Sequence, residues 1–121
     1  MSDVLARRWA EAVAGKDWAA LRALLSDDVD FRGMTPGRIW EGSSPDEVAE
    51  VLGQWFEEGD AVESVVLVET DAFADRQTAH YRLTVRNGDG LHLVDQTAYL
   101  GGQDQVAWAR VTCAGFRPID G

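Results

Sequence analysis

The sequence has very little of what anchors or cross-links several classes of protein. Cys113 is the single cysteine among 121 residues, which excludes an intramolecular disulfide framework and any metal site built from several cysteines. No apolar run approaches the roughly 18 residues of a membrane helix. The N-terminal stretch lacks the continuous apolar core of a secretory signal. We therefore expect a soluble protein in a reducing, cytoplasmic environment.

Basic residues are also scarce, because 11 Lys and Arg stand against 21 Asp and Glu, giving a formal net charge of −10. Nucleic acids and anionic membranes both require a basic footprint, so we expect neither as a partner. The two histidines and the acidic residues show no H-x-x-x-H or E-x-x-H spacing, and no Lys-Ser or Lys-Thr pair follows a glycine-rich stretch. We therefore expect no metal site and no bound cofactor.

The length and composition are those of one domain. The chain is 45% hydrophobic and shows no internal repeat, linker or low-complexity segment. A chain of this size can bury roughly two-thirds of its unfolded surface and so hold its own core. We treat residues 1–121 as a single domain.

Three stretches have apolar residues at the spacing of a helix buried along one side. The first follows a possible cap at Ser2 and ends at Gly15, where a left-handed backbone is expected. The second begins at Asp17, and the third at residues 44–47, which combine a Ser cap, a Pro and a Glu. The expected inward residues are Leu5, Trp9, Ala12 and Val13; Trp18, Leu21, Leu24 and Leu25; and Val48, Val51, Leu52, Trp55 and Phe56.

The rest of the chain is typical of strands and turns. Residues 29–32 alternate between apolar and polar, whereas residues 33–44 are rich in Gly, Pro and Ser and predict a long loop. Four strands are expected after Gly59, at residues 61–70, 78–86, 91–100 and 105–116, with a hairpin turn at residues 87–90. The order α-α-β-α-β-β-β-β predicts an α+β fold in which three helices cover one face of a curved antiparallel sheet.

That order and four blocks of sequence resemble the nuclear transport factor 2-like superfamily. The blocks that resemble its opening and its last hairpin are RRWAEAVAGKDWAALRALLSDDVDF and TAYLGGQDQVAWARVTCAGFRP, and FRGMTPGRIWEGSSPDEV and RVTCAGFRP resemble a bacterial branch of it. The superfamily has a cone-shaped α+β fold shared by ketosteroid isomerases, SnoaL-like polyketide cyclases and limonene epoxide hydrolase. The resemblance implies a pocket between the helices and the concave face of the sheet, and a homodimer through the opposite face.

Strand alternation assigns the side chains to these two faces. A two-residue turn at Gly88-Asp89 pairs Tyr81 with Gln96 and Val85 with His92. The more apolar face is assigned to the pocket and carries Val29, Phe31, Ala79, Tyr81, Leu83, Val85, His92, Val94, Gln96, Ala98, Ala107, Ala109, Val111 and Cys113. The opposite face carries Asp30, Arg32, His80, Arg82, Thr84, Leu93, Asp95, Thr97, Tyr99, Val106, Trp108 and Arg110. The predicted homodimer contacts on it are Arg82, Leu93, Asp95, Tyr99, Trp108 and Arg110.

The resemblance also permits a comparison with the isomerase site. The tyrosine of the first helix matches Trp9, whose indole can donate a hydrogen bond but cannot shuttle a proton. The general-base aspartate matches Gly33, and the second aspartate matches Gln96. A hydrogen-bonding pair without a base favours binding a carbonyl or hydroxyl over reacting with it.

We therefore expect a small-molecule-binding protein with a mostly apolar pocket lined by Trp9, Phe31, Trp40, Tyr81, Gln96, Ala109 and Cys113. An isomerase- or cyclase-type enzyme acting on a polycyclic or apolar substrate is the first alternative, with His92 or Glu41 as the acid or base. The second is a non-catalytic dimeric assembly protein with a filled pocket. Asp30, Arg32 and Asp95 have the residue types of the epoxide-hydrolase site, but alternation turns all three outward.

Overall fold

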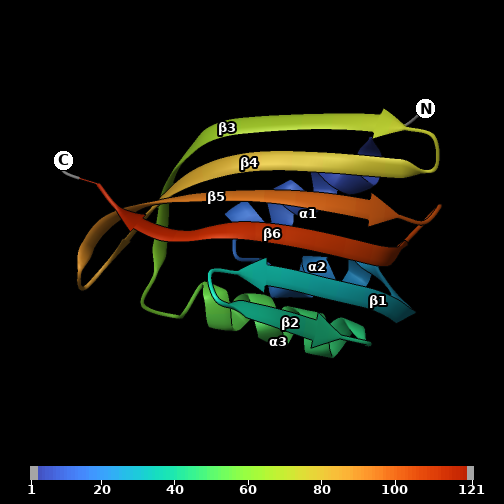
Figure 1. Ribbon diagram of the computed structural model, residues 1–121, viewed down its shortest axis with the longest axis horizontal. Coiled ribbons are helices and arrows are strands. Elements are labelled where there is room, and N and C mark those ends of the chain that lie inside the picture. Colours follow the sequence, from blue (N-terminus) through green and yellow to red (C-terminus); the bar gives the residue numbers. More distant parts are fainter. Residues whose placement is uncertain (1–2, 120–121) are drawn as a thin grey trace.

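A computed structural model describes residues 3–119 (Figure 1). The helices and strands, in chain order, are α1 (Val4–Ala14), α2 (Trp18–Leu24), β1 (Leu25–Thr35), β2 (Arg38–Gly42), α3 (Pro45–Trp55), β3 (Ala61–Phe73), β4 (Arg76–Asn87), β5 (Gly90–Gly101) and β6 (Val106–Pro118). None of the described helices is long and apolar enough to cross a lipid bilayer.

The six strands form one sheet in the order β2-β1-β6-β5-β4-β3, and the three helices lie together behind it in Figure 1. This confirms the α+β architecture, in which apolar helix stripes cover one face of a curved sheet. The sheet is mixed, however, because β1 and β6 run parallel while the other neighbours are antiparallel. The antiparallel meander predicted after Gly59 is confirmed in β3 to β6, and the structure departs from the antiparallel prediction at β1, which joins β6 in parallel through long-range pairing.

The segment predicted as a long loop, residues 33–44, is largely a hairpin. β1 continues to Thr35 and β2 pairs back onto it, with Gly33 opposite Trp40 and Thr35 opposite Arg38. The turn contains Pro36 and Gly37, and Gly37 has φ = 79°, a backbone conformation that glycine adopts without strain. The prediction of a loop was wrong because β2 is only five residues long and begins next to this turn.

Local capping follows the sequence closely. The Asp17 carboxylate accepts the backbone N–H of Ala20 at the start of α2, and the Ser44 hydroxyl accepts that of Glu47 at the start of α3. Both interactions satisfy N–H groups that the first helical turn leaves without partners. The cap expected at Ser2 lies outside the described residues.

The left-handed residue expected at Gly15 lies one position later. Gly15 has φ = −86°, whereas Lys16 has φ = 51°. The Lys16 ammonium group donates to the carbonyl oxygens of Glu57 and Asp60 at 2.6 and 2.7 Å. These two bonds tie Lys16, whose backbone conformation is one that a lysine rarely adopts, to the segment after α3.

The register of β4 and β5 is the predicted one, with Tyr81 opposite Gln96, His92 opposite Val85, and Arg82 opposite Asp95. The assignment of the first residues of β6 was wrong, since Val106 is fully buried and Ala107 is exposed. Val106 pairs with Leu25, but Trp108 pairs with Asp30, so the ladder is irregular between these pairs and the alternation shifts there.

Candidate functional site

Four of the residues expected to line a pocket form one chain of hydrogen bonds through the apolar interior. Trp9 Nε1 on α1 donates to Tyr81 Oη at 3.0 Å, Tyr81 Oη donates to Gln96 Oε1 at 2.7 Å, and Gln96 Nε2 donates to Cys113 Sγ at 3.3 Å. Because the Tyr81 hydroxyl accepts from Trp9, its proton goes to Gln96 and thereby orients the amide. The chain joins α1 to strands β4, β5 and β6.

All four side chains are buried, with exposed fractions of 0% for Trp9 and Gln96, 1% for Tyr81 and 7% for Cys113. Burial raises the pKa of Tyr81 well above its ordinary value of 10.0, and this outweighs the opposing effect of the Trp9 hydrogen bond. Tyr81 is therefore a neutral hydrogen-bonding group at physiological pH. Four hollows of 350–530 Å³ lie on the surface, and none of these four is lined by Trp9, Tyr81 or Gln96.

Strand β1 contributes Phe31 to the interior, where Phe31 and its β6 partner Ala109 are both buried. The next inward position is Gly33, which matches the isomerase general base. A Cβ atom built on Gly33 would lie 2.5 Å from Cη2 and 2.7 Å from Cζ2 of Trp55. The indole of Trp55 therefore occupies the space that a carboxylate at position 33 would require.

A row of aromatic rings connects β2 with α1. The ring centroids of Trp40 and Trp55 lie 6.2 Å apart, those of Trp55 and Phe31 lie 6.4 Å apart, and those of Phe31 and Trp9 lie 6.5 Å apart. Trp40 is half-buried, and its Nε1 donates to the Thr35 hydroxyl at 2.8 Å. The row runs from the interior hydrogen-bond chain to the rim of the sheet.

His92, a candidate acid or base, faces the interior and is 8% exposed. Its ring centroid lies 6.3 Å from that of Phe116, which in turn lies 5.5 Å from that of Phe56. Its Nδ1 is buried and has no hydrogen-bond partner within residues 3–119, and the same holds for Nε1 of Trp55. Such groups are uncommon in folded proteins, because burial without a partner is unfavourable.

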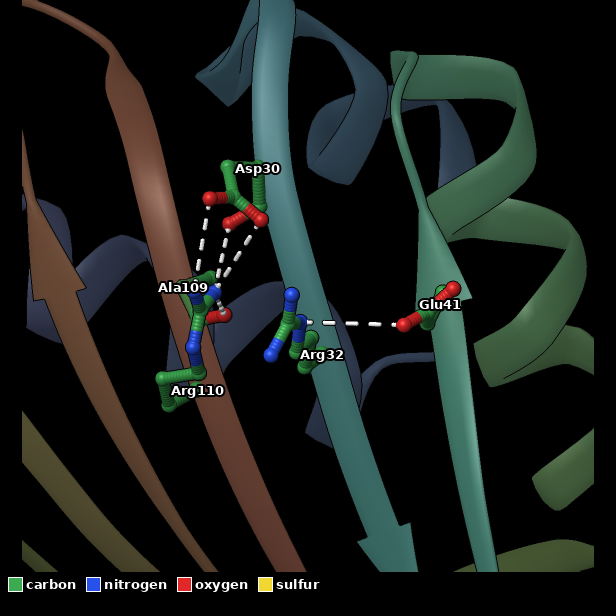
Figure 2. A network of polar contacts seen from close by, with 5 residues as sticks. All are labelled: Asp30, Arg32, Glu41, Ala109 and Arg110. Carbon is green, nitrogen blue, oxygen red and sulfur yellow. Dashed lines mark hydrogen bonds and ion pairs between the residues drawn. The ribbon is translucent and has the colours of Figure 1, made fainter.

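The other candidate, Glu41, is turned away from the interior. Figure 2 shows its carboxylate beside Arg32, at 3.7 Å, on the face of the sheet opposite the helices. On the same face Arg110 pairs with Asp30 at 3.3 Å. The prediction that Asp30 and Arg32 point outward is confirmed, and Glu41 shares their face because β2 pairs with β1 as a hairpin.

The outer face of β4 and β5 carries a charged cluster centred on Asp95. Its carboxylate is 2.9 Å from His80 Nε2 and 2.9 Å from Arg82 Nε. Trp108, on the neighbouring strand, lies between two guanidinium groups, with Arg76 at 4.3 Å and Arg110 at 4.6 Å from its ring. Trp108 is therefore covered by its own chain, and Leu93 is partly buried.

Three exposed apolar side chains of this face lie together further along the sheet. Met34, Ile39 and Tyr99 are 49%, 65% and 42% exposed. They line a groove of about 350 Å³ together with Arg32, Arg110, Val111 and Thr112. Tyr99 was among the predicted dimer contacts, but sequence reasoning missed Met34 and Ile39, because both fell in the segment predicted as a loop. Within the described part of the chain, no group of three or more His, Cys, Asp or Glu side chains could hold a metal ion.

Comparison with known proteins identifies the family. A family model described as SnoaL-like domain matches residues 6–115. No curated protein matches the sequence. Three similar solved structures are a candidate isomerase from Rhodopseudomonas palustris (14% identity, TM-score 0.73, 93% of this chain and 91% of that chain), a candidate SnoaL-like polyketide cyclase from Mesorhizobium loti (15%, 0.69, 92% and 98%) and an LEH-like epoxide hydrolase from M. tuberculosis (12%, 0.66, 92% and 80%). At these identities the likeness shows the fold alone.

Proposed function

The chain belongs to the SnoaL-like domain family of the nuclear transport factor 2-like superfamily, and we propose that it binds an apolar or polycyclic small molecule in its interior without transforming it. The hydrogen-bond chain from Trp9 to Cys113, which lies among apolar and aromatic side chains, supports this proposal. Ligand sites of this kind combine an apolar lining with a few fixed polar groups.

Gln96 is the member of this chain best suited to meet a ligand. A glutamine amide can make four hydrogen bonds, and Gln96 makes two with the described residues, one through Oε1 and one through Nε2. A second N–H and a second lone pair are left for a ligand carbonyl or hydroxyl. Tyr81 and Cys113 fix the plane of the amide, so a ligand would meet a group that is already oriented.

Gly33 favours binding over isomerase-type catalysis. Proton abstraction needs a base within hydrogen-bond reach of the substrate, and the place of that base in the isomerase pattern is filled by the Trp55 ring. Glutamine does not titrate, and burial keeps Tyr81 protonated. Tyr81 and Gln96 can therefore position a carbonyl group but cannot exchange protons with it near neutral pH.

A thermal-shift screen tests this proposal, using steroids, aromatic polyketides, terpenoid epoxides and fatty acids. A ligand at about 100 times its Kd adds about 2.7 kcal/mol to the free energy of unfolding. At about 4 °C per kcal/mol for a domain of this size, the Tm should rise by roughly 10 °C. Gln96→Met should reduce the ligand-induced rise, measured from its own ligand-free Tm, whereas Gln103→Met on the exposed β5–β6 turn should not. No rise with any class would contradict the proposal.

His92 supports one alternative, a cyclase- or isomerase-type enzyme. Its imidazole is buried, and Nδ1 has no partner among the described residues 3–119, which leaves this nitrogen free for a hydrogen bond or proton transfer with a ligand. In that case a bound ligand should be turned over by the wild type and by His80→Gln, a matched change on the outer face. His92→Gln should abolish turnover while binding persists. Turnover that survives His92→Gln would remove this alternative.

The exposed groove containing Met34, Ile39 and Tyr99 supports a homodimer through the outer face of the sheet. The proposed location of this homodimer is the cytoplasm. Exposed apolar patches rimmed by polar residues are typical of protein interfaces. Light scattering should give twice the chain mass for the wild type and the monomer mass for Ile39→Asp. Gln103→Asp, on the exposed turn between β5 and β6, should leave the dimer intact. A dimeric Ile39→Asp variant would place the contact elsewhere.

A further inference from the structure

Trp55 lies directly on the backbone of β1. Its six-membered ring is so close to Gly33 that even a methyl group at that position would collide with it. Phe31 and Trp40 contact Trp55 at centroid distances of 6.4 and 6.2 Å. The flat indole thus packs between a strand backbone and two aromatic rings that are inclined to it by 47° (Phe31) and 78° (Trp40).

The ring contacts of Trp55 are not accompanied by a hydrogen bond. Trp9 and Trp40, the other tryptophans of the aromatic row, each donate their indole N–H, to Tyr81 and to Thr35. The N–H of Trp55 is buried and has no acceptor in the described part of the chain. Displacing the ring breaks no hydrogen bond and lets the N–H reach an acceptor, so the usual penalty for exposing a buried indole is partly offset.

Trp55 also lies where the chain can move it. It is the last residue of α3, and Phe56 already has a non-helical backbone, with φ = −112° and ψ = 82°. The backbone carbonyls of a helix's last turn have no partners within the helix, so this end of the backbone is held by fewer hydrogen bonds than the middle. Rotation of Trp55 therefore leaves the body of α3 in place.

A groove of about 530 Å³ runs along the outside of this region, between β2 and α3. Its lining is Arg38, Ile39, Trp40, Glu41, Glu47, Glu50, Val51 and Gln54. Trp40 is both a wall of the groove and the edge-on neighbour of Trp55. The outer side of Trp40 is already stacked against a flat group, since the Arg38 guanidinium lies 3.5 Å from its ring centroid. Trp40 therefore contacts both the groove and the Trp55 ring.

We propose that the space filled by Trp55 is the binding site of a planar, largely apolar molecule that enters from the β2–α3 groove and displaces the indole. This rests on the proposed function and adds its route of entry, the flat shape of its ligand, and Trp55 as the residue that must move. Flat bicyclic or polycyclic molecules fit because they replace a flat ring between Phe31, Trp40 and the Gly33 backbone.

Fluorine NMR of protein labelled with 5-fluorotryptophan tests the displacement directly. The chain has five tryptophans, so each resonance can be assigned with a single Trp→Phe variant. Titration with indanone, a planar bicyclic ketone, should shift or broaden the Trp55 resonance. The Trp108 resonance, from the outer face, should stay unchanged. A Trp55 resonance that stays fixed throughout the titration would overturn the proposal.

Affinity gives a second, independent measurement. If the wild type must displace Trp55 before binding, the displaced state is a minor population and the apparent affinity is reduced in proportion. Trp55→Ala should therefore bind indanone about tenfold more tightly than the wild type, and Trp108→Ala should bind it equally. Equal affinity in Trp55→Ala and wild type would contradict the proposal. If Trp55→Ala does not fold, the NMR titration of the wild type decides.

The thermal-shift and NMR results together distinguish ligand binding at Gln96 from displacement of Trp55. If a screened ligand stabilises the wild type in a Gln96-dependent manner while the Trp55 resonance stays fixed, interior binding stands and displacement of Trp55 is wrong. If indanone moves the Trp55 resonance but no stabilisation depends on Gln96, the site over Gly33 stands and the role proposed for the hydrogen-bond chain is wrong.

Discussion

Removing the Tyr81 hydroxyl should destabilise the protein far more than removing the same group from Tyr99. The Tyr81 hydroxyl accepts from Trp9 and donates to Gln96, and both partners are 0% exposed. Phenylalanine leaves two buried polar atoms, Trp9 Nε1 and Gln96 Oε1, without these partners. Each such atom costs about 1–3 kcal/mol, so Tyr81→Phe should lower the free energy of unfolding by about 2–6 kcal/mol.

Tyr99→Phe is the matched control, because Tyr99 is 42% exposed and water can replace its hydrogen bonds. Its effect should stay within about 0.5 kcal/mol. Urea unfolding followed by tryptophan fluorescence measures both variants, and an unchanged m-value would show that the denatured state is the same. A loss of about 3 kcal/mol corresponds to roughly 12 °C in Tm. If Tyr81→Phe and Tyr99→Phe are equally stable, the hydrogen-bond chain contributes nothing to stability and the reasoning is refuted.

Two further changes test the packing and the charges. Gly33→Ala should lower the free energy of unfolding in urea by about 1–3 kcal/mol, because its Cβ would collide with the Trp55 ring. Gly88→Ala should be nearly neutral, since nothing lies within 4 Å of a Cβ atom at that position. Equal losses in the two variants would argue against the Gly33–Trp55 contact. Hydrogen bonds from Ser43 lower the pKa of Glu47 below its ordinary value of 4.5, so their stabilisation is complete above that pH and is lost as the pH falls through the lowered pKa. Glu47→Gln should therefore be less stable than the wild type at pH 7 and equal to it in acid, as measured by unfolding across a pH series, and a pH-independent difference would contradict the assignment.

Much of the fold could be predicted because the responsible signals are local. The caps at Asp17 and Ser44 act within one helical turn, and the stripe of apolar residues identifies each buried helix face. The hairpin turn set the β4–β5 register, which brought Tyr81 opposite Gln96. The hairpin of β1 and β2 was missed because its second strand has five residues and its pairing depends on a Pro-Gly turn inside a segment of loop-like composition.

Part of the candidate site could likewise be predicted from local sequence patterns, and part depends on packing between distant segments. Alternation along β4, β5 and most of β6 placed Tyr81, Gln96 and Cys113 on one face, but their hydrogen bonds to each other and to Trp9 depend on how α1 packs against the sheet. Glu41 could not be assigned to a face from its sequence, because its strand had not been recognised. Its outward position follows from pairing with Arg32.

The three helices, the register of the β4–β5 hairpin and the lack of a carboxylate at Gly33 all follow from the amino-acid sequence, because each depends on residue type or on near neighbours in the chain. Three features could be known only from the folded chain: β1 runs parallel to β6, Trp55 covers Gly33, and Trp55 and His92 each bury a nitrogen that has no partner among residues 3–119. These features arise from contacts between segments far apart in the chain, where side-chain volume and strand pairing act together and no local pattern records the outcome.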